Sequence, residues 1–210
     1  MGKPVKKAGP PFRVLVVCVG NVCRSPLTEG LLVRAAKEQG LRIVTESAGT
    51  KAMSGWEMDP ITQAQLQEHQ IDPSGFRARQ LLPEHLERAD LVLTANRSVR
   101  GSALQLHPQA VRRTFTITEA AARASPNVVR GTGTLQEWVE EAVRHRPDVA
   151  DVELDIPDPR GQRRKVHKRV AQTIEQAVTN LVAGWSQWVT ELDVAPAPAA
   201  NPRGDAQAAG

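Results

Sequence analysis

The sequence contains no tyrosine and only three phenylalanines among its 210 residues. Proteins that bind single-stranded nucleic acid stack the bases on aromatic side chains, so this composition disfavours nucleic acid as a partner. The net charge of +4 and the pI near 9.4 still favour anionic partners in general.

Cysteine is equally scarce, because Cys18 and Cys23 are the only two. Two cysteines are too few for a disulfide scaffold, and no histidine pattern accompanies them as zinc would require. We therefore expect neither a metal nor a cofactor.

Long apolar runs are absent too. No segment approaches the roughly 20 residues of a membrane span, and the first residues lack the apolar core of a secretory signal. We expect a cytoplasmic protein that does not contact a membrane.

Composition divides the chain into three parts. Residues 1–11 are rich in lysine and proline and predict a flexible basic leader. Residues 193–210 are rich in alanine, proline and glycine, with almost no bulky apolar side chain, and predict a disordered tail. Residues 12–192 between them are long enough for one domain with a substantial core.

Within that domain, apolar runs alternate with segments of helical periodicity. Strands are expected at residues 12–17, 42–46, 90–95 and 113–117. Helices are expected from Pro26, from Pro60, and at residues 97–106, 135–145 and 163–192. This order predicts an α/β fold: a three-layer sandwich with an open, mostly parallel four-stranded sheet and helices on both faces. Ligands of such folds bind at the carboxyl ends of the strands.

The chain is organised around residues 12–32, where an apolar strand is followed by the loop 18–25 and then by a helix. Free backbone N–H groups and the positive end of the helix dipole make such a junction a site for an anion such as phosphate. The same field stabilises a thiolate at Cys18 and makes it a nucleophile.

The other residues of this loop fit phosphate chemistry. The planar guanidinium of Arg24 suits two phosphate oxygens. Gly20 permits a positive φ, and Asn21 tolerates one better than other residues with a side chain. Ser25 can donate a hydrogen bond to the sulfur as a leaving group. The alternative, a buried and inert Cys18, leaves these neighbours unexplained.

The stretch VCVGNVCRSP at 17–26 resembles the phosphate loop of the low-molecular-weight protein-tyrosine phosphatases. The likeness covers about residues 12–182 and includes SAGT at 47–50, ARQL at 78–81, ADLVL at 89–93 and DIPDP at 155–159. It implies that Cys18 is the nucleophile, that Arg24 binds phosphate, and that Asp158 is the general acid, with Asp155 as the rival. The phosphate-binding residues would be Val19, Gly20, Asn21, Val22, Cys23, Arg24 and Ser25.

The resemblance implies a cysteine-dependent phosphomonoesterase that acts on phosphotyrosine in proteins and releases inorganic phosphate. A protein-arginine phosphatase is the second interpretation, although its relatives tend to carry threonine at the position of Val22. A non-catalytic module that binds a phosphorylated ligand is the third. The family also implies a reversible Cys18–Cys23 disulfide, and the alternative is that Cys23 only packs under the loop.

Several residues depart from the family or allow two interpretations. Arg160 follows Asp158-Pro159 where the family commonly has tyrosines, and six cations lie between residues 160 and 169: a site for an acidic peptide, or a solvated helix face. Phe76 occupies a position where the family often has a histidine bonded to the phosphate loop. Trp56 is either a wall of the site or a packing residue. Trp185 and Trp188 extend beyond the usual end of the family and either pack locally or meet a partner.

Overall fold

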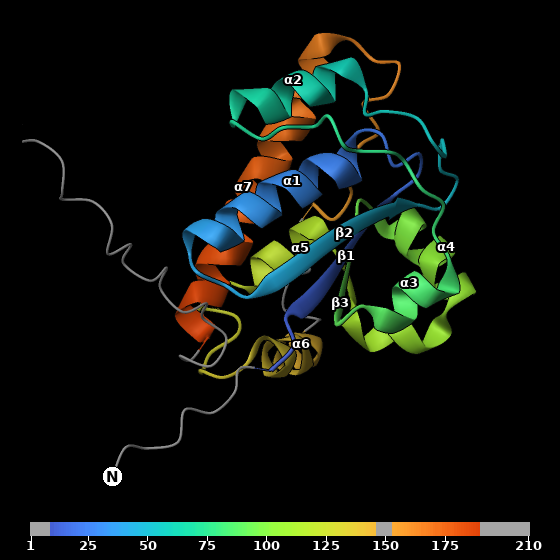
Figure 1. The fold of residues 1–210 in the computed structure, drawn as a ribbon. Helices are drawn as coiled ribbons and strands as arrows, with labels where there is room; N and C mark the ends of the chain where they lie inside the picture. Colours follow the sequence, from blue (N-terminus) through green and yellow to red (C-terminus); the bar gives the residue numbers. More distant parts are fainter. Residues whose placement is uncertain (1–8, 146–152, 190–210) are drawn as a thin grey trace, which may run out of the picture.

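The computed structural model describes residues 9–145 and 153–189 (Figure 1). Residues 1–8 of the expected leader, most of the expected loop at 146–155, and the expected tail at 193–210 fall outside the described residues, so these predictions stay as they are.

A four-stranded sheet lies at the centre, in the order β2-β1-β3-β4. Its strands are β1 (Phe12–Cys18), β2 (Ile43–Gly49), β3 (Leu91–Thr94) and β4 (Thr114–Thr116), and all pairs are parallel. Six of the seven β1 residues are buried, because a central parallel strand is covered on both faces. In this register Cys18, the last residue of β1, is the partner of Gly49, the last residue of β2.

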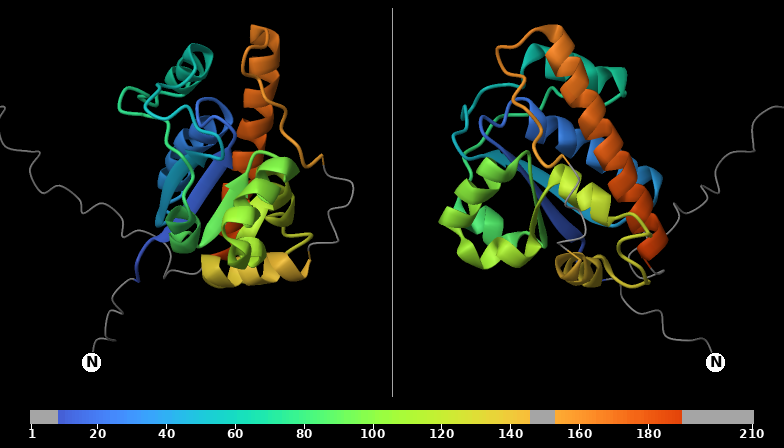
Figure 2. Two further views of the ribbon diagram at one scale, coloured as in Figure 1. Left: turned by 90° about the vertical axis from the view of Figure 1, so that its right-hand side faces the viewer. Right: turned by 180° about the vertical axis from the view of Figure 1, so that it is seen from behind.

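Helices cover both faces of the sheet, which confirms the predicted three-layer α/β architecture (Figure 1). One face packs against α1 (Arg24–Glu38), α5 (Ile117–Arg123) and α7 (Arg164–Trp188), and the other packs against α3 (Pro83–Arg88) and α4 (Arg97–Leu106). Helix α2 (Pro60–Glu68) lies beside α1 and α7 near the carboxyl end of the sheet. Helix α6 (Leu135–Arg144) lies at the opposite end, where β1 begins (Figure 2).

The element boundaries differ from the sequence predictions in several places. Strand β2 continues to Gly49 instead of ending at residue 46, and α7 ends at Trp188 instead of residue 192. Helix α1 begins at Arg24, two residues before Pro26, because proline is tolerated anywhere in a first turn whose N–H groups lack helical partners. The fourth strand ends at Thr116 instead of Ile117, because Ile117 is the first residue of α5. Thr116 and Glu119 form a capping box at the start of this helix.

Three short elements were not predicted: α3, α5 and the 3₁₀ helix η1 (Pro108–Arg113). Helices of six or seven residues carry too few turns for a periodic apolar pattern, and they form because the sheet supplies the surface on which they pack.

The carboxyl end of α7 packs locally. Trp185 is fully buried and meets the rings of Phe12 and Trp138 edge to face, with centroids 6.2 and 5.6 Å apart. The indole N–H of Trp188 donates to the carbonyl of Thr134 at 2.9 Å. The sequence alternative of local packing is therefore correct for both tryptophans. No helix in the described part of the chain is long and apolar enough to cross a membrane.

We predict that Trp185→Ala lowers the free energy of unfolding by about 3–5 kcal/mol, because it leaves a large cavity between α7, α6 and the start of β1. Urea unfolding measures this change. The matched control is Trp56→Ala, whose side chain is 62% exposed and which should change the free energy by less than about 0.5 kcal/mol. Equal effects of the two substitutions would contradict the packing described here.

Candidate active site

The loop after β1 is held by its carbonyl groups, which face away from the cysteine. The carbonyls of Cys18, Val19 and Gly20 accept hydrogen bonds from the backbone N–H groups of Thr50, Lys51 and Met53, each at 3.0 Å. These bonds fasten the loop to the segment after β2, so the loop's amide side is left to face inward.

Gly49 sits where β2 meets this loop and leaves no room for a side chain. A Cβ atom built on Gly49 would lie 2.4 Å from the carbonyl oxygen of Val19 and 3.0 Å from the backbone nitrogen of Asn21. Both are backbone atoms with little freedom to move. Any other residue at 49 would therefore push the loop away from the sheet.

Asn21 connects the loop to the rest of the site. Its φ is 56°, a left-handed conformation that asparagine tolerates, whereas Gly20 does not adopt a positive φ. The Asn21 carboxamide is fully buried and donates to the hydroxyls of Ser25 and Ser47, both at 2.9 Å. Its oxygen accepts from the backbone N–H of Arg79 at 2.9 Å. One side chain thus joins the loop, β2 and the segment before α3.

The sulfur of Cys18 lies inside this loop. It receives the backbone N–H of Asn21 at 3.2 Å and lies 3.0 Å from the hydroxyl oxygen of Ser25. Among the hydrogen bonds of the described residues, the backbone N–H groups of Val19, Gly20 and residues 22–25 have no acceptor. Buried, unpaired amide donors are costly, and a ring of them beside a helix start is suited to an anion.

Arg24 reaches from the loop to the segment before α7. Its side chain is 1% exposed, and its Nη1 donates to the carbonyl of Ile156 at 3.0 Å. Its Nη2 pairs with Oδ2 of Asp158 at 2.6 Å, and Asp158 is 46% exposed. The buried Nε has no hydrogen-bond partner among the described residues. The structure therefore brings Cys18, Arg24 and Asp158 together.

Asp155 is engaged elsewhere. Its carboxylate accepts from the backbone N–H of Arg97 at 2.8 Å and from Nε and Nη2 of the same guanidinium at 3.0 and 2.7 Å. These hydrogen bonds hold the pKa of Asp155 below its ordinary value. Asp155 thus anchors the loop at the start of α4, and it makes no contact with Arg24 or Cys18 in the described structure.

The two cysteines differ in their surroundings. Burial, reinforced by the charge of Asp59, raises the pKa of the Cys23 thiol to about 12. Cys23 is therefore a neutral thiol at physiological pH and packs against Val22 and Ala78. Both cysteines are free thiols in the structure, and the regulatory disulfide stays a prediction.

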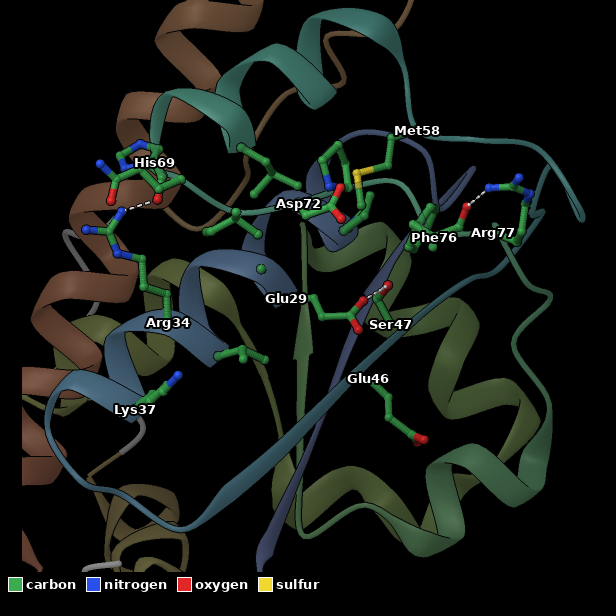
Figure 3. Close-up of a pocket in the computed structure, with 18 of the residues that line it drawn as sticks. Glu29, Arg34, Lys37, Glu46, Ser47, Met58, His69, Asp72, Phe76 and Arg77 are labelled. Carbon is green, nitrogen blue, oxygen red and sulfur yellow. Dashed lines mark hydrogen bonds between the residues drawn. The ribbon is translucent and has the colours of Figure 1, made fainter. Parts of the chain in front are cut away.

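A partly buried carboxyl, that of Glu29, lies behind the loop, on α1. The hydroxyl of Ser47 donates to Oε2 of Glu29 at 2.5 Å, as the close-up shows (Figure 3). Because Ser47 accepts from Asn21, its own hydrogen is directed to Glu29. The carboxylate therefore orients a chain of hydrogen bonds that runs from Glu29 through Ser47 and Asn21 to Ser25 and the sulfur.

Burial raises the pKa of Glu29, and the Ser47 hydrogen bond and the charge of Arg79 only partly oppose this. Arg79 donates from Nε to the carbonyl of Ser47 at 2.8 Å. Phe76, in the position where the family often has a histidine, packs on Val22 and Cys23 instead of joining this network.

Sequence reasoning missed the supporting roles of Glu29, Arg79 and Gly49. Glu29 is the one acidic residue in residues 24–36 of a predicted apolar helix, which is a weak signal. Arg79 acts partly through its backbone N–H, which leaves no trace in residue type, and partly through Nε, whose partner Ser47 lies on another element. Gly49 lies within the quoted stretch 47–50, but its close contact needs the fold to be known. No group of three or more metal-ligating side chains occurs in the residues described.

Several known proteins are similar to this chain in sequence. A sequence model described as low molecular weight phosphotyrosine protein phosphatase matches residues 13–128. A probable low molecular weight protein-tyrosine-phosphatase, EpsP, of Ralstonia solanacearum is 37% identical over 106 residues, which are 50% of this chain and 70% of that protein. A low molecular weight protein-tyrosine-phosphatase of Streptomyces coelicolor is 30% identical over 178 residues, 82% of this chain and 92% of that protein.

A solved structure shares the fold. The YwlE arginine phosphatase from Geobacillus stearothermophilus matches with a TM-score of 0.60 and 27% identity, over 82% of this chain and 92% of that one. The likeness thus extends well beyond residues 13–128.

We predict that Glu29→Gln changes how stability depends on pH. Because the folded pKa of Glu29 is raised, the folded protein keeps a proton that the unfolded chain releases above about pH 4.5, so this group lowers stability as pH rises from there through the folded pKa. The stability of the variant minus that of the wild type should therefore rise across this window. Urea unfolding at several pH values measures it, with exposed Glu38→Gln as the control; a flat difference for Glu29→Gln would contradict the assignment.

Proposed function

This chain belongs to the low molecular weight phosphotyrosine protein phosphatase family, and on that footing we propose that it is a protein-tyrosine phosphatase acting through a thiol-phosphate on Cys18. The observation that supports this best is the loop itself. Its sulfur, its unpaired amide donors and the guanidinium of Arg24 lie together, with the carboxylate of Asp158 bound to that guanidinium.

In the first step, the thiolate of Cys18 attacks phosphorus, and the bond to the tyrosine oxygen breaks. Asp158 gives its proton to that oxygen. The amide donors of residues 19–25 stabilise the equatorial oxygens. Nη1 of Arg24 is held by Ile156, so Nε and Nη2 form the edge of the guanidinium that would grip phosphate. The phosphate then takes the place of Asp158 at Nη2, which frees the carboxyl group for the leaving oxygen.

In the second step, water attacks the phosphorus of the thiol-phosphate, and the Asp158 carboxylate accepts the proton of that water. The bond between phosphorus and sulfur breaks, and inorganic phosphate leaves. Ser25, 3.0 Å from the sulfur, donates its hydrogen bond to the departing thiolate. The Glu29, Ser47 and Asn21 chain keeps that hydroxyl oriented.

A protein-arginine phosphatase is the second candidate, and the likeness to the Geobacillus stearothermophilus enzyme supports it. Val22 lines the groove beside the loop, together with Met53 and Trp56. These apolar side chains suit an aromatic ring, whereas Glu57 and Asp59 in the same groove can accept hydrogen bonds from a guanidinium. Hydrolysis rates for matched phosphotyrosine and phosphoarginine peptides distinguish the two functions. A cytoplasmic location is part of the same proposal, since protein substrates of this kind are met there.

We predict that Cys18→Ser abolishes hydrolysis of an aryl phosphate and of both phosphopeptides, while inorganic phosphate still binds. The serine hydroxyl is not ionised at neutral pH and is a poor nucleophile, but the amide donors and Arg24 are unchanged. Steady-state rates and calorimetric titration with phosphate measure the two properties. The control Cys23→Ser removes the other sulfur and should keep most of the activity. Turnover by Cys18→Ser near the wild-type rate would refute the mechanism.

We predict that Asp158→Asn lowers kcat about 10²- to 10⁴-fold, the usual contribution of a general acid. Phosphate should bind more tightly to this variant, because the carboxylate no longer competes for Nη2 of Arg24. The matched control Asp155→Asn should stay within about fivefold of the wild type, since an exposed ion pair is worth about 0–1 kcal/mol. A larger loss of kcat in Asp155→Asn than in Asp158→Asn would show that the acid was assigned wrongly. A wild type that binds phosphate but hydrolyses no substrate would instead favour the non-catalytic binding module.

A further inference from the structure

A groove of about 780 Å³ opens beside the phosphate loop, a size suited to a substrate side chain and its neighbours. Trp56, which is 62% exposed, lines it together with Asp158 and Arg160. Its other lining residues include the apolar Val22 and Met53 and the acidic Glu57 and Asp59.

The three carboxylates of this groove already have partners. Glu57 pairs with Arg77 at 3.3 Å, Asp158 pairs with Arg24, and Asp59 caps α2 by accepting the N–H of Ile61 at 2.9 Å. The guanidinium of Arg160 pairs with no carboxylate in the described part of the chain. Arg160 is therefore the cation of this groove that is available to bind an anion on the substrate.

Arg160 is also placed next to the proposed chemistry. Its backbone N–H donates to Oδ1 of Asp158 at 3.2 Å, so its side chain begins two residues from the acid. An extended peptide advances about 3.3–3.6 Å per residue. Arg160 and Asp158 line the same groove, so the residues next to a phosphotyrosine held at Cys18 are the ones that Arg160 would meet.

The neighbouring cations strengthen the positive field at this edge. Arg163, Arg164 and Lys165 surround the first turn of α7, which contains no acidic residue, and Lys168 and Arg169 follow. All are exposed, and none forms an ion pair with a described residue. Cations at a helix N-terminus are unfavourable, and like charges so close together repel each other. An anion on the substrate would relieve both.

Because they rest on the proposed phosphatase function, these observations concern which phosphopeptide the site prefers. We propose that Arg160 forms a subsite for a second anionic group next to the phosphotyrosine, with the cations of residues 163–169 supplying attraction at longer range. The anion is either an acidic side chain or a second phosphoryl group, since a guanidinium binds both through the same paired donors. The family commonly has tyrosines after the acid, whereas this chain has the cation Arg160 there.

The test uses phosphotyrosine peptides that differ only at flanking positions: glutamate, glutamine or phosphoserine. Values of kcat/KM are measured for the full-length wild type, for Arg160→Gln, and for the control Arg112→Gln, an exposed arginine in η1. Each value is divided by the same protein's kcat/KM for an aryl phosphate, so that changes in chemistry cancel.

The wild type should favour the glutamate peptide over the glutamine peptide about fivefold, the upper end for an ion pair between exposed groups, and the phosphoserine peptide at least as strongly. Arg160→Gln should reduce both ratios to about 1–2, and Arg112→Gln should keep them. Added salt at 0.5 M should lower the wild-type ratios, because exposed charges are screened. The larger of the two wild-type ratios identifies the preferred anion.

An Arg160→Gln variant that keeps the wild-type ratios would overturn the subsite, as would a wild type that hydrolyses all three peptides equally. In both cases the aryl phosphate is still hydrolysed, so the proposed function stands while this inference fails. A wild type that does not hydrolyse the aryl phosphate refutes the proposed function, and the subsite with it.

Discussion

The buried carboxamide of Asn21 is the interaction on which the site depends. It holds a residue of the loop in a left-handed conformation. Its two N–H donors and its oxygen form hydrogen bonds with three different segments. A loop of free amide donors repels itself and would relax in isolation. Here the donors are kept together by one fully satisfied side chain, whose partners are themselves fixed by the sheet.

The parallel sheet explains why these partners are available. Cys18 and Gly49 end neighbouring strands in register, and Ala95 follows the end of β3. The N–H of Ile156 donates to the carbonyl of Ala95 at 2.9 Å, while the carbonyl of Ile156 accepts from Arg24. The segment that carries Asp158 is thus fastened on both sides to the carboxyl edge of the sheet. Residues more than 130 positions apart meet because three strands end at the same edge.

Much of this arrangement can be predicted from sequence, because its strongest signals are local. The apolar run before Cys18 and the helical periodicity after Pro26 predict the strand, the loop and the helix, and the order of elements predicts the sheet. Short helices such as α3 and α5 escape prediction because the surface on which they pack, rather than their own periodicity, makes them form. Their caps carry some information, as the Thr116 and Glu119 box shows.

The parts that sequence could not decide are those set by distant partners. The family likeness names Asp158 as the acid with Asp155 as the rival, and only the position of Arg97, 58 residues before Asp155, shows that Asp155 is an anchor. Glu29 becomes part of the site through Ser47 on another element. The same holds for Arg160, because only the fold shows that it lines the groove beside the phosphate loop and that its guanidinium pairs with no carboxylate of the described residues.

The central claim is that phosphoryl transfer passes through the sulfur of Cys18. The most direct measurement is an acid quench of the enzyme within one turnover of an aryl phosphate, followed by mass spectrometry of its peptides. The account predicts a phosphoryl group on Cys18 and on no other residue, with more of it retained in a variant whose second step is slowed. Hydrolysis at the normal rate with no phosphorylated peptide, or with the phosphoryl group on Cys23 or another residue, would contradict it.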